Sequence, residues 1–209
     1  MHKEKRRLLI IGAGGHGKVV ADVASKINMY SDIAFLDDDT TIEAVGRYQC
    51  EGTVDKLKME SKQTEVFVAI GNAITRRKVM NFVEEEGFPI PTLIHPCAVL
   101  GEEVTVEYGT VVMAGAVINS GAKIGKGVIV NTSSSVDHDC AIDDFVHVAV
   151  GAHVAGTVHV GENSWIGAGA VLSNNITLTS DVVIGAGGVV IKDILKPGTY
   201  VGVPVKRLK

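Results

Sequence analysis

Residues 131–160 read NTSSSV-DHDCAI-DDFVHV-AVGAHV-AGTVHV, in which every sixth residue is Val or Ile. The same spacing runs from Ile94 to Val190 without an insertion, and every position in the series is Ile, Leu or Val. A fixed short period is typical of a solenoid, in which each repeat buries its apolar side chain by stacking on its neighbours. Six residues is neither the helical period nor the alternation of an ordinary strand. The repeat therefore predicts a coil with three flat sides, in which each hexad supplies one short strand and one corner.

Three hexads make one predicted turn of 18 residues, so that residue i lies beneath residue i+18. The position four after each aliphatic residue is mostly small or apolar, as at Ala122 and Ala152. This position is expected to point inward beside the large aliphatic residue. Cys140 has the inward phase, so we expect a buried filler rather than a nucleophile paired with its neighbour His138.

His138 lies in the most polar stretch of the repeat, residues 131–139. Its phase, two after Val136, predicts a side chain that points outward. The residue 18 positions later is Gly156, which has no side chain. An imidazole beneath a bare glycine would leave room for a substrate and an exposed backbone N–H. These are the general base and the oxyanion donor that acyl transfer requires.

Three more histidines, His147, His153 and His159, follow at intervals of six. A step of six turns the coil by one side, so these side chains are expected to face different directions. That arrangement argues against a shared metal ion. His153 and His159 are expected to be solvated corner residues.

Composition narrows the classes of partner. The chain has 209 residues, a formal net charge of −4 and three cysteines without metal-type spacing. The charge argues against nucleic acid as the main partner, and the sparse cysteines indicate reduced thiols and a cytoplasmic protein. No apolar stretch approaches the length of a membrane span, so no membrane insertion is expected.

Residues 1–90 have a different pattern, in which strands alternate with helices. The expected strands are Leu8–Ile11, Ile33–Leu36 and Val66–Ile70, and the expected helices are Lys18–Ile27 and Arg76–Glu86. This alternation predicts a small α/β domain with a parallel sheet, similar to half of a Rossmann fold. The repeat domain is expected over residues 91–191, and residues 192–209 are expected to form an irregular tail.

A glycine-rich loop follows the first expected strand. Gly12, Gly14 and Gly17 match G-x-G-x-x-G, and Asp37 and Asp38 end the next strand. Such glycines let the backbone approach a phosphate at a helix N-terminus, and the acidic pair can bind ribose or base. Because about 90 residues hold only half of a dinucleotide fold, a nucleotide sugar is favoured over NAD. The alternative is a glycine turn that serves only tight packing.

Nine short motifs together resemble one known family. They are IGAGGHGKVV at 11–20, FLDD at 35–38, AIGN at 69–72, LIHP at 93–96, NTSS at 131–134, HDC at 138–140, FVHV at 145–148, VGA at 150–152 and YVGVP at 200–204. With these motifs the chain resembles the left-handed β-helix, hexapeptide-repeat acyltransferases. The similarity is to the nucleotide-aminosugar N-acetyltransferase branch, which is also described as sialic acid O-acetyltransferase-like. It extends over nearly the whole chain.

The resemblance implies a homotrimer that holds acetyl-CoA in the grooves between left-handed β-helices and uses no metal. It implies that the small domain binds a UDP- or dTDP-linked 4-amino sugar. By motif, His138 is the general base and Asp139, where family members often have Glu, supports its basicity. The implied substrate-binding residues are Gly14, Gly15, His16, Asp37, Asp38 and Gly71. The implied acetyl-CoA residues are His147, Ala168 and Ala186. Gly156 joins the expected cofactor-binding residues from its spacing above His138, which would place its N–H beside the reacting acetyl group.

These observations predict an acetyl-CoA-dependent N-acetyltransferase. Its expected substrate is the 4-amino group of a UDP- or dTDP-linked 4-amino-4,6-dideoxy sugar, used for bacterial surface polysaccharide or glycoprotein synthesis. One alternative is an O-acetyltransferase that acts on a sialic acid hydroxyl, although the acidic pair and the glycine loop favour a nucleotide-bearing acceptor. A second alternative is a non-catalytic scaffold that binds nucleotide sugars, against which the polar stretch 131–139 argues.

Overall fold

The computed structural model describes residues 6–208 and divides the chain into two compact units, Met1–His95 and Pro96–Lys209. The predicted join was at residue 90. The division lies further along the chain because Leu93 is buried and its short strand β6 (Leu93–Ile94) contacts helix α1 (Gly15–Ile27).

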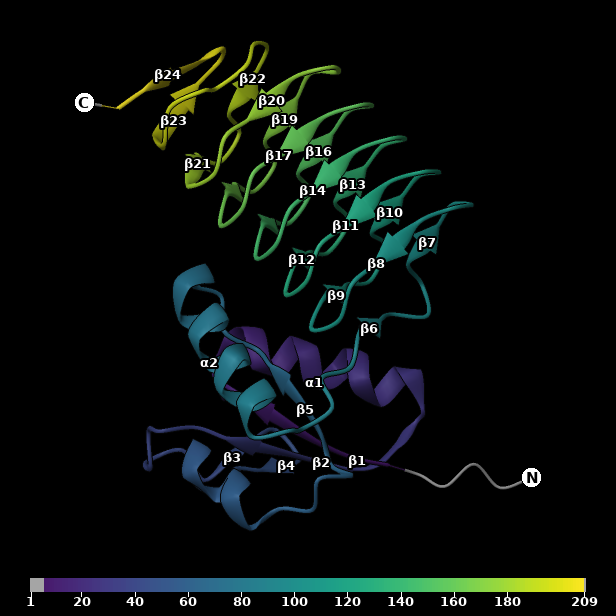
Figure 1. The fold of residues 1–209 in the computed structure, drawn as a ribbon, viewed down its shortest axis with the longest axis vertical. Coiled ribbons are helices and arrows are strands. Elements are labelled where there is room, and N and C mark those ends of the chain that lie inside the picture. The colour runs from purple at the N-terminus through teal and green to yellow at the C-terminus, as the bar shows by residue number, and fades with distance from the viewer. Residues whose placement is uncertain (1–5, 209) are drawn as a thin grey trace. The chain divides into compact units, whose positions relative to one another are not determined.

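The first unit contains a parallel sheet of three strands in the order β2-β1-β5 (Figure 1). Its strands are β1 (Arg6–Ile11), β2 (Tyr30–Leu36) and β5 (Glu65–Val68). Helix α1 follows β1, and α2 (Ala73–Glu85) follows β5. An antiparallel pair, β3 (Ala44–Val45) and β4 (Tyr48–Gln49), and the 3-10 helix η1 (Val54–Met59) lie between β2 and β5 in the chain. The predicted α/β fold is confirmed.

Local sequence explains these elements. Leu8–Ile11 is buried throughout because β1 is the central strand, and a central parallel strand is covered on both faces. Helix α2 begins after Asn72, whose side chain accepts a hydrogen bond of 2.9 Å from the Thr75 N–H. Both helices begin three residues before their predicted starts. Their first turns carry small and polar residues and, in α2, the exposed Ile74, rather than an apolar stripe.

The second unit is a left-handed parallel β-helix with three sides, as predicted (Figure 1). The first side consists of β7 (Val99–Leu100), β10 (Val117–Ile118), β13 (Ser135–Val136), β16 (His153–Val154), β19 (Val171–Leu172) and β22 (Val189–Val190). The second side consists of β8 (Thr105–Val106), β11 (Lys123–Ile124), β14 (Ala141–Ile142), β17 (His159–Val160) and β20 (Thr177–Leu178). The third side consists of β9 (Val111–Val112), β12 (Ile129–Val130), β15 (His147–Val148), β18 (Trp165–Ile166), β21 (Val182–Ile184), β23 (Gly198–Gly202) and β24 (Val205–Arg207).

Strand pairing confirms the predicted stacking of residue i beneath residue i+18. Ser135 pairs with Val117 below and with His153 above, for example. From Val112 to Val190 every aliphatic residue of the hexad series is buried. Each short strand points one aliphatic side chain into the coil. An isolated strand could not bury that side chain, but strands stacked in successive coils cover one another's side chains.

Residues 192–209, expected to be irregular, contain two strands. Strand β23 pairs in parallel with β21, and β24 pairs with β23 in antiparallel fashion. The chain therefore extends the third side after the hexad period has ended. Within residues 6–208 no helix has the length and apolar character needed to cross a membrane.

Candidate active site and nucleotide-sugar site

His138 lies at the corner between β13 and β14, where its exposed imidazole pairs with the next residue. Its Nδ1 is 2.9 Å from Oδ2 of Asp139. The hydrogen bond with Asp139 raises the pKa of the imidazole, and the nearby charges of Asp137 and Asp139 add to that rise. A proton on Nδ1 that is donated to the carboxylate leaves the Nε2 lone pair free to act as a base.

The imidazole of His138 lies directly against Gly156 of the next coil. A Cβ built on Gly156 would be 2.5 Å from Nε2 and 2.7 Å from Cε1 of His138. The expected stacking is therefore present, but the expected empty space is not, because the ring itself fills it. No protein group among residues 6–208 accepts a hydrogen bond from the Gly156 N–H. Only glycine at this position leaves room for the ring where the structure places it.

Two polar residues that the sequence analysis missed hold the same corner. Oδ1 of Asp137 accepts hydrogen bonds from Nδ2 of Asn119 at 2.7 Å and from the backbone N–H of His138 at 2.8 Å. The hydrogen bond from Asn119 lowers the pKa of Asp137 and keeps it charged. The signal was available, because Asn119 precedes Asp137 by one 18-residue turn.

Cys140 is buried, as predicted. Its Sγ donates a weak hydrogen bond of 3.1 Å to the carbonyl oxygen of Ala155. Burial raises the pKa of the thiol, so it is not activated as a nucleophile.

Of the residues expected to contact acetyl-CoA, Gly156 lies against His138, whereas Ala168, Ala186 and His147 lie elsewhere on the same chain. Ala168 and Ala186 occupy the corner that follows the third side, where the Ala168 carbonyl accepts from the Gly187 N–H at 2.8 Å. His147 lies on the third side, stacked on Trp165 with ring centroids 5.0 Å apart. One chain therefore does not bring His138 together with these three residues.

His153 and His159 were expected at corners, and this was wrong. Both lie in strands, β16 and β17, because each immediately precedes the aliphatic residue of its hexad. His153 Nδ1 is 2.9 Å from the Ser135 hydroxyl, and His159 Nε2 is 2.9 Å from Oδ2 of Asp143.

The glycine loop of the first unit contains two kinds of glycine. Gly12 has a positive φ of 106°, and a Cβ there would be 2.8 Å from the Ala69 carbonyl oxygen. A Cβ on Gly17 would overlap the carbonyl oxygen of Gly12. Gly14 and Gly15, at the start of α1, have open space in front of them instead. The first pair serves packing, and the second pair leaves the helix N-terminus open to a ligand.

The two aspartates of the acidic pair, Asp37 and Asp38, make different contacts. Oδ2 of Asp37 accepts a hydrogen bond of 2.7 Å from the Ala13 N–H, which fixes the glycine loop to the end of β2. Asp38 is exposed and accepts a hydrogen bond of 3.2 Å from the Val54 N–H. Gly71 follows β5 at the same edge of the sheet. Because the carboxyl ends of β1, β2 and β5 meet at that edge, the structure gathers the predicted substrate-binding residues there.

His16 lies in the first turn of α1, close enough to the buried Arg76 of α2 to feel its charge. His16 Nε2 is buried without a hydrogen-bond partner, and burial, with a contribution from the charge of Arg76, lowers its pKa to about 4. Arg76 is only 1% exposed, and its Nη1 donates hydrogen bonds of 2.8 Å to the carbonyl oxygens of Ile70 and Gly71. Sequence reasoning missed Arg76, because it is reached only through the packing of α2 on the loop.

Within the part of the chain that the structure describes, no group of three or more His, Cys, Asp or Glu side chains is placed to hold a metal ion.

Both units of the chain are similar to known proteins. The family described as PglD N-terminal domain matches residues 7–83. The acetyltransferase domain of PglB from Neisseria gonorrhoeae FA1090 is 43% identical, with a TM-score of 0.95 over 97% of this chain and 100% of that one. The same domain has been solved in complex with acetyl coenzyme A, with a TM-score of 0.94. PerB from Caulobacter crescentus, solved in complex with CoA and GDP-perosamine, is 36% identical over 97% of each chain, with a TM-score of 0.92.

A curated relative, the UDP-N-acetylbacillosamine N-acetyltransferase of Bacillus subtilis (strain 168), is 33% identical over 115 residues. That alignment spans about half of each protein, 52% of this chain and 52% of the relative. The coil of hexads, the small α/β unit and these relatives define one class of protein. The chain belongs to the hexapeptide-repeat, left-handed β-helix family of sugar N-acetyltransferases.

Proposed function

We propose that this protein transfers an acetyl group from acetyl-CoA to the 4-amino group of a nucleotide-linked 4-amino-4,6-dideoxy sugar. The observation that carries the proposal is the His138–Asp139 pair, with its free Nε2 at a corner of the β-helix. Support comes from the 43% identity to an acetyltransferase domain that binds acetyl coenzyme A.

In the proposed reaction the sugar amine attacks the thioester carbonyl carbon of acetyl-CoA directly. Nε2 of His138 takes the proton that the attacking nitrogen loses, and Asp139 stabilises the imidazolium that forms. The Gly156 N–H, which has no protein acceptor within residues 6–208, donates to the oxyanion of the tetrahedral intermediate. Collapse of that intermediate breaks the carbon–sulfur bond, and the released thiolate takes the proton from His138 to leave as CoA. No acyl-enzyme forms.

Asp137 acts on the base through position. Its Oδ1 holds the backbone N–H of His138, and Asn119 holds the same oxygen from the coil below. We assign both as positioning residues for the imidazole.

The nucleotide sugar occupies the first unit. Its diphosphate lies at the open N-terminus of α1 over Gly14 and Gly15, next to His16 and the Gly71 turn. Asp38 binds the ribose, while Asp37 fixes the loop. A free sialic acid has neither a diphosphate nor a ribose for these groups, which favours N-acetylation of a nucleotide sugar over sialic acid O-acetylation.

The nucleotide stays open among the uridine, thymidine and guanosine diphosphates. Relatives are named for UDP-N-acetylbacillosamine and for perosamine, the latter bound as GDP-perosamine. A product of this class would serve bacterial surface glycan synthesis in the cytoplasm.

Acetyl-CoA binds between subunits of a homotrimer in this proposal. His138 and Ala168 lie on different corners of one chain, so a partner subunit supplies the corner of Ala168 and Ala186, together with His147, to the site around His138. Light scattering at assay concentration tests this assembly: a trimer supports it, and a monomer contradicts it.

Thiol release from acetyl-CoA tests the activity. The panel contains UDP-, dTDP- and GDP-linked 4-amino-4,6-dideoxy sugars, with free sialic acid as the competing acceptor. Release with one of the amino sugars, with mass-spectrometric detection of an added acetyl group, supports the proposal. Thiol release with sialic acid but with none of the amino sugars would establish the O-acetyltransferase alternative. If none of the acceptors supports thiol release, the non-catalytic scaffold is favoured.

A further inference from the structure

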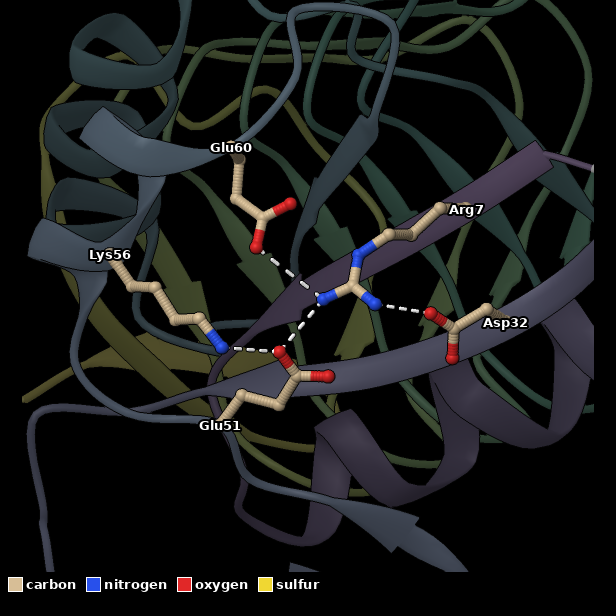
Figure 2. Close-up of polar contacts among 5 residues, drawn as sticks. All are labelled: Arg7, Asp32, Glu51, Lys56 and Glu60. Atoms are coloured by element: carbon tan, nitrogen blue, oxygen red, sulfur yellow. Dashed lines mark hydrogen bonds and ion pairs between the residues drawn. The ribbon is translucent and has the colours of Figure 1, made fainter.

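A cluster of five charged side chains lies in the first unit (Figure 2). The Arg7 guanidinium of β1 contacts three carboxylates. Nη1 pairs with Asp32, and Nη2 is 2.7 Å from Oε2 of Glu51 and 3.4 Å from Oε1 of Glu60. Lys56 of η1 pairs with the same Oε2 of Glu51. The Arg7 and Glu51 side chains are 28% and 24% exposed, so these ion pairs are partly shielded from water.

Glu51 belongs to residues 50–54, a segment that runs along the end of β2. The Glu51 N–H donates to the Phe35 carbonyl at 2.8 Å. The next residue, Gly52, accepts from the Asp37 N–H at 2.9 Å, and the Val54 N–H donates to the Asp38 carboxylate at 3.2 Å. The segment therefore holds the backbone of Asp37 and the side chain of Asp38.

We infer that Arg7 and Lys56, through Glu51, set the position of Asp37 and Asp38 and so tune the affinity of the first unit for its nucleotide sugar. Arg7 and Lys56 are positioning residues in this inference, since neither contacts the acidic pair. The part that concerns the nucleotide sugar rests on the function proposed above.

The ion pairs of Arg7 and Lys56 can affect Asp37 and Asp38 without touching them, because residues 50–54 connect the two groups. Residues 50–54 connect β4 to η1 and are held to the end of β2 by backbone hydrogen bonds, while Arg7, in the central strand β1, anchors the Glu51 side chain. A single exposed ion pair contributes little to stability, but a guanidinium that is shared among three carboxylates, of which Glu51 and Glu60 are partly shielded, orders more than one segment at once. Loss of the anchor at Glu51 would loosen the segment, and with it the carboxylate that Val54 orients.

Two lysines of η1 provide a matched pair of variants. Lys56→Met removes the cation that holds Glu51, and Lys58→Met removes a cation whose partner is the exposed Asp55, at 2.7 Å. Both variants lose one positive charge from the same short helix. Glu51→Gln completes the set, because it removes a negative charge. General electrostatics would then strengthen the binding of an anionic nucleotide, whereas loss of positioning would weaken it.

The experiment combines three measurements on the full chain. Hydrogen exchange of the Asp37 and Val54 amides reports the segment, calorimetry with UDP, dTDP and GDP reports the site, and steady-state kinetics separate KM from kcat. We expect faster exchange in Lys56→Met and Glu51→Gln, about threefold to tenfold weaker nucleoside diphosphate binding and an equal rise in KM for the nucleotide sugar. The kcat value and the KM for acetyl-CoA should not change. Lys58→Met should match the wild type throughout.

Unchanged exchange in both Lys56→Met and Glu51→Gln would overturn the inference, whatever the activity of the protein. Tighter binding by Glu51→Gln would also overturn it, in favour of bulk electrostatics. If exchange changes but the wild type binds none of the three diphosphates and acetylates no amino sugar, the proposed function fails instead, and only the link from the network to nucleotide affinity falls with it. Arg7→Met, checked for folding by thermal unfolding, should repeat the effect of Lys56→Met.

Discussion

Gly156→Ala should lower the rate of catalysis by displacing the imidazole of His138, although it leaves that residue unchanged. A Cβ at residue 156 would be 2.5 Å from Nε2 and 3.0 Å from Cδ2 of His138, whereas an ordinary contact needs about 3.5 Å. The imidazole must therefore withdraw by about 1 Å. The fold can accept the change, because the φ of Gly156 lies outside the left-handed region and the atom that must move belongs to an exposed side chain.

A displacement of about 1 Å at a reacting group costs on the order of 10²-fold in rate. We expect Gly156→Ala to lose roughly this factor in kcat, with an unchanged melting temperature and unchanged acetyl-CoA binding. Thiol release under saturating substrates measures the loss, and thermal unfolding provides the control.

A double-mutant cycle shows whether the loss passes through the imidazole. If Gly156→Ala acts by displacing His138, then adding it to His138→Ala should change the rate no further. Wild-type turnover by Gly156→Ala would show that the imidazole is not displaced, and additive losses in the double variant would show that the effect bypasses His138.

Three further predictions concern the two sites. Asp139→Asn should lower the pKa of His138, so the acid limb of the kcat/KM profile should move to lower pH, with a smaller loss of rate than in His138→Ala; an unmoved limb would contradict the role of Asp139. Gly17→Ala should destabilise the protein by about 3 kcal/mol or more, because its Cβ overlaps the Gly12 carbonyl oxygen. Gly14→Val should keep the melting temperature of the wild type and lose nucleotide-sugar binding in calorimetry. The reverse result would contradict the assignment of Gly17 to packing and Gly14 to the ligand. His16 binds its proton more weakly when folded, so its contribution to stability is complete above its ordinary pKa of 6.5 and is lost as the pH falls toward about 4; chemical denaturation should show a decline up to about 3 kcal/mol larger in the wild type than in His16→Asn, and equal declines would contradict the burial of His16.

The β-helix could be predicted from the sequence because its period is a physical requirement of the fold. Each of the buried positions from Val112 to Val190 needs an aliphatic residue, and a single insertion would break the stack. The same arithmetic placed Gly156 above His138 and Cys140 inside the coil. The expectation of empty space beside Gly156 was wrong, because the spacing identifies His138 as the neighbour but does not say that its ring turns toward Gly156.

The arrangement of the first unit was less predictable from sequence. The alternation of strands and helices indicated a parallel sheet, and the sheet brings Gly14, Asp38 and Gly71 to one edge. The effect of the Arg76 charge on His16 and the cluster around Arg7 depend on tertiary packing between elements far apart in the chain. No periodic pattern connects such residues, so no spacing rule could have found them.

In the proposed mechanism Nε2 of His138 removes the proton from the sugar amine, and His138→Ala takes that base away. Single-turnover and steady-state assays would follow acetyl transfer to the amino sugar that the wild type accepts, with calorimetry for both ligands. We expect kcat to fall by roughly 10²–10⁴-fold, the usual worth of a positioned base, while KM and the binding of both ligands stay nearly unchanged. A His138→Ala variant with the kcat of the wild type would contradict the mechanism and leave the fold unaffected.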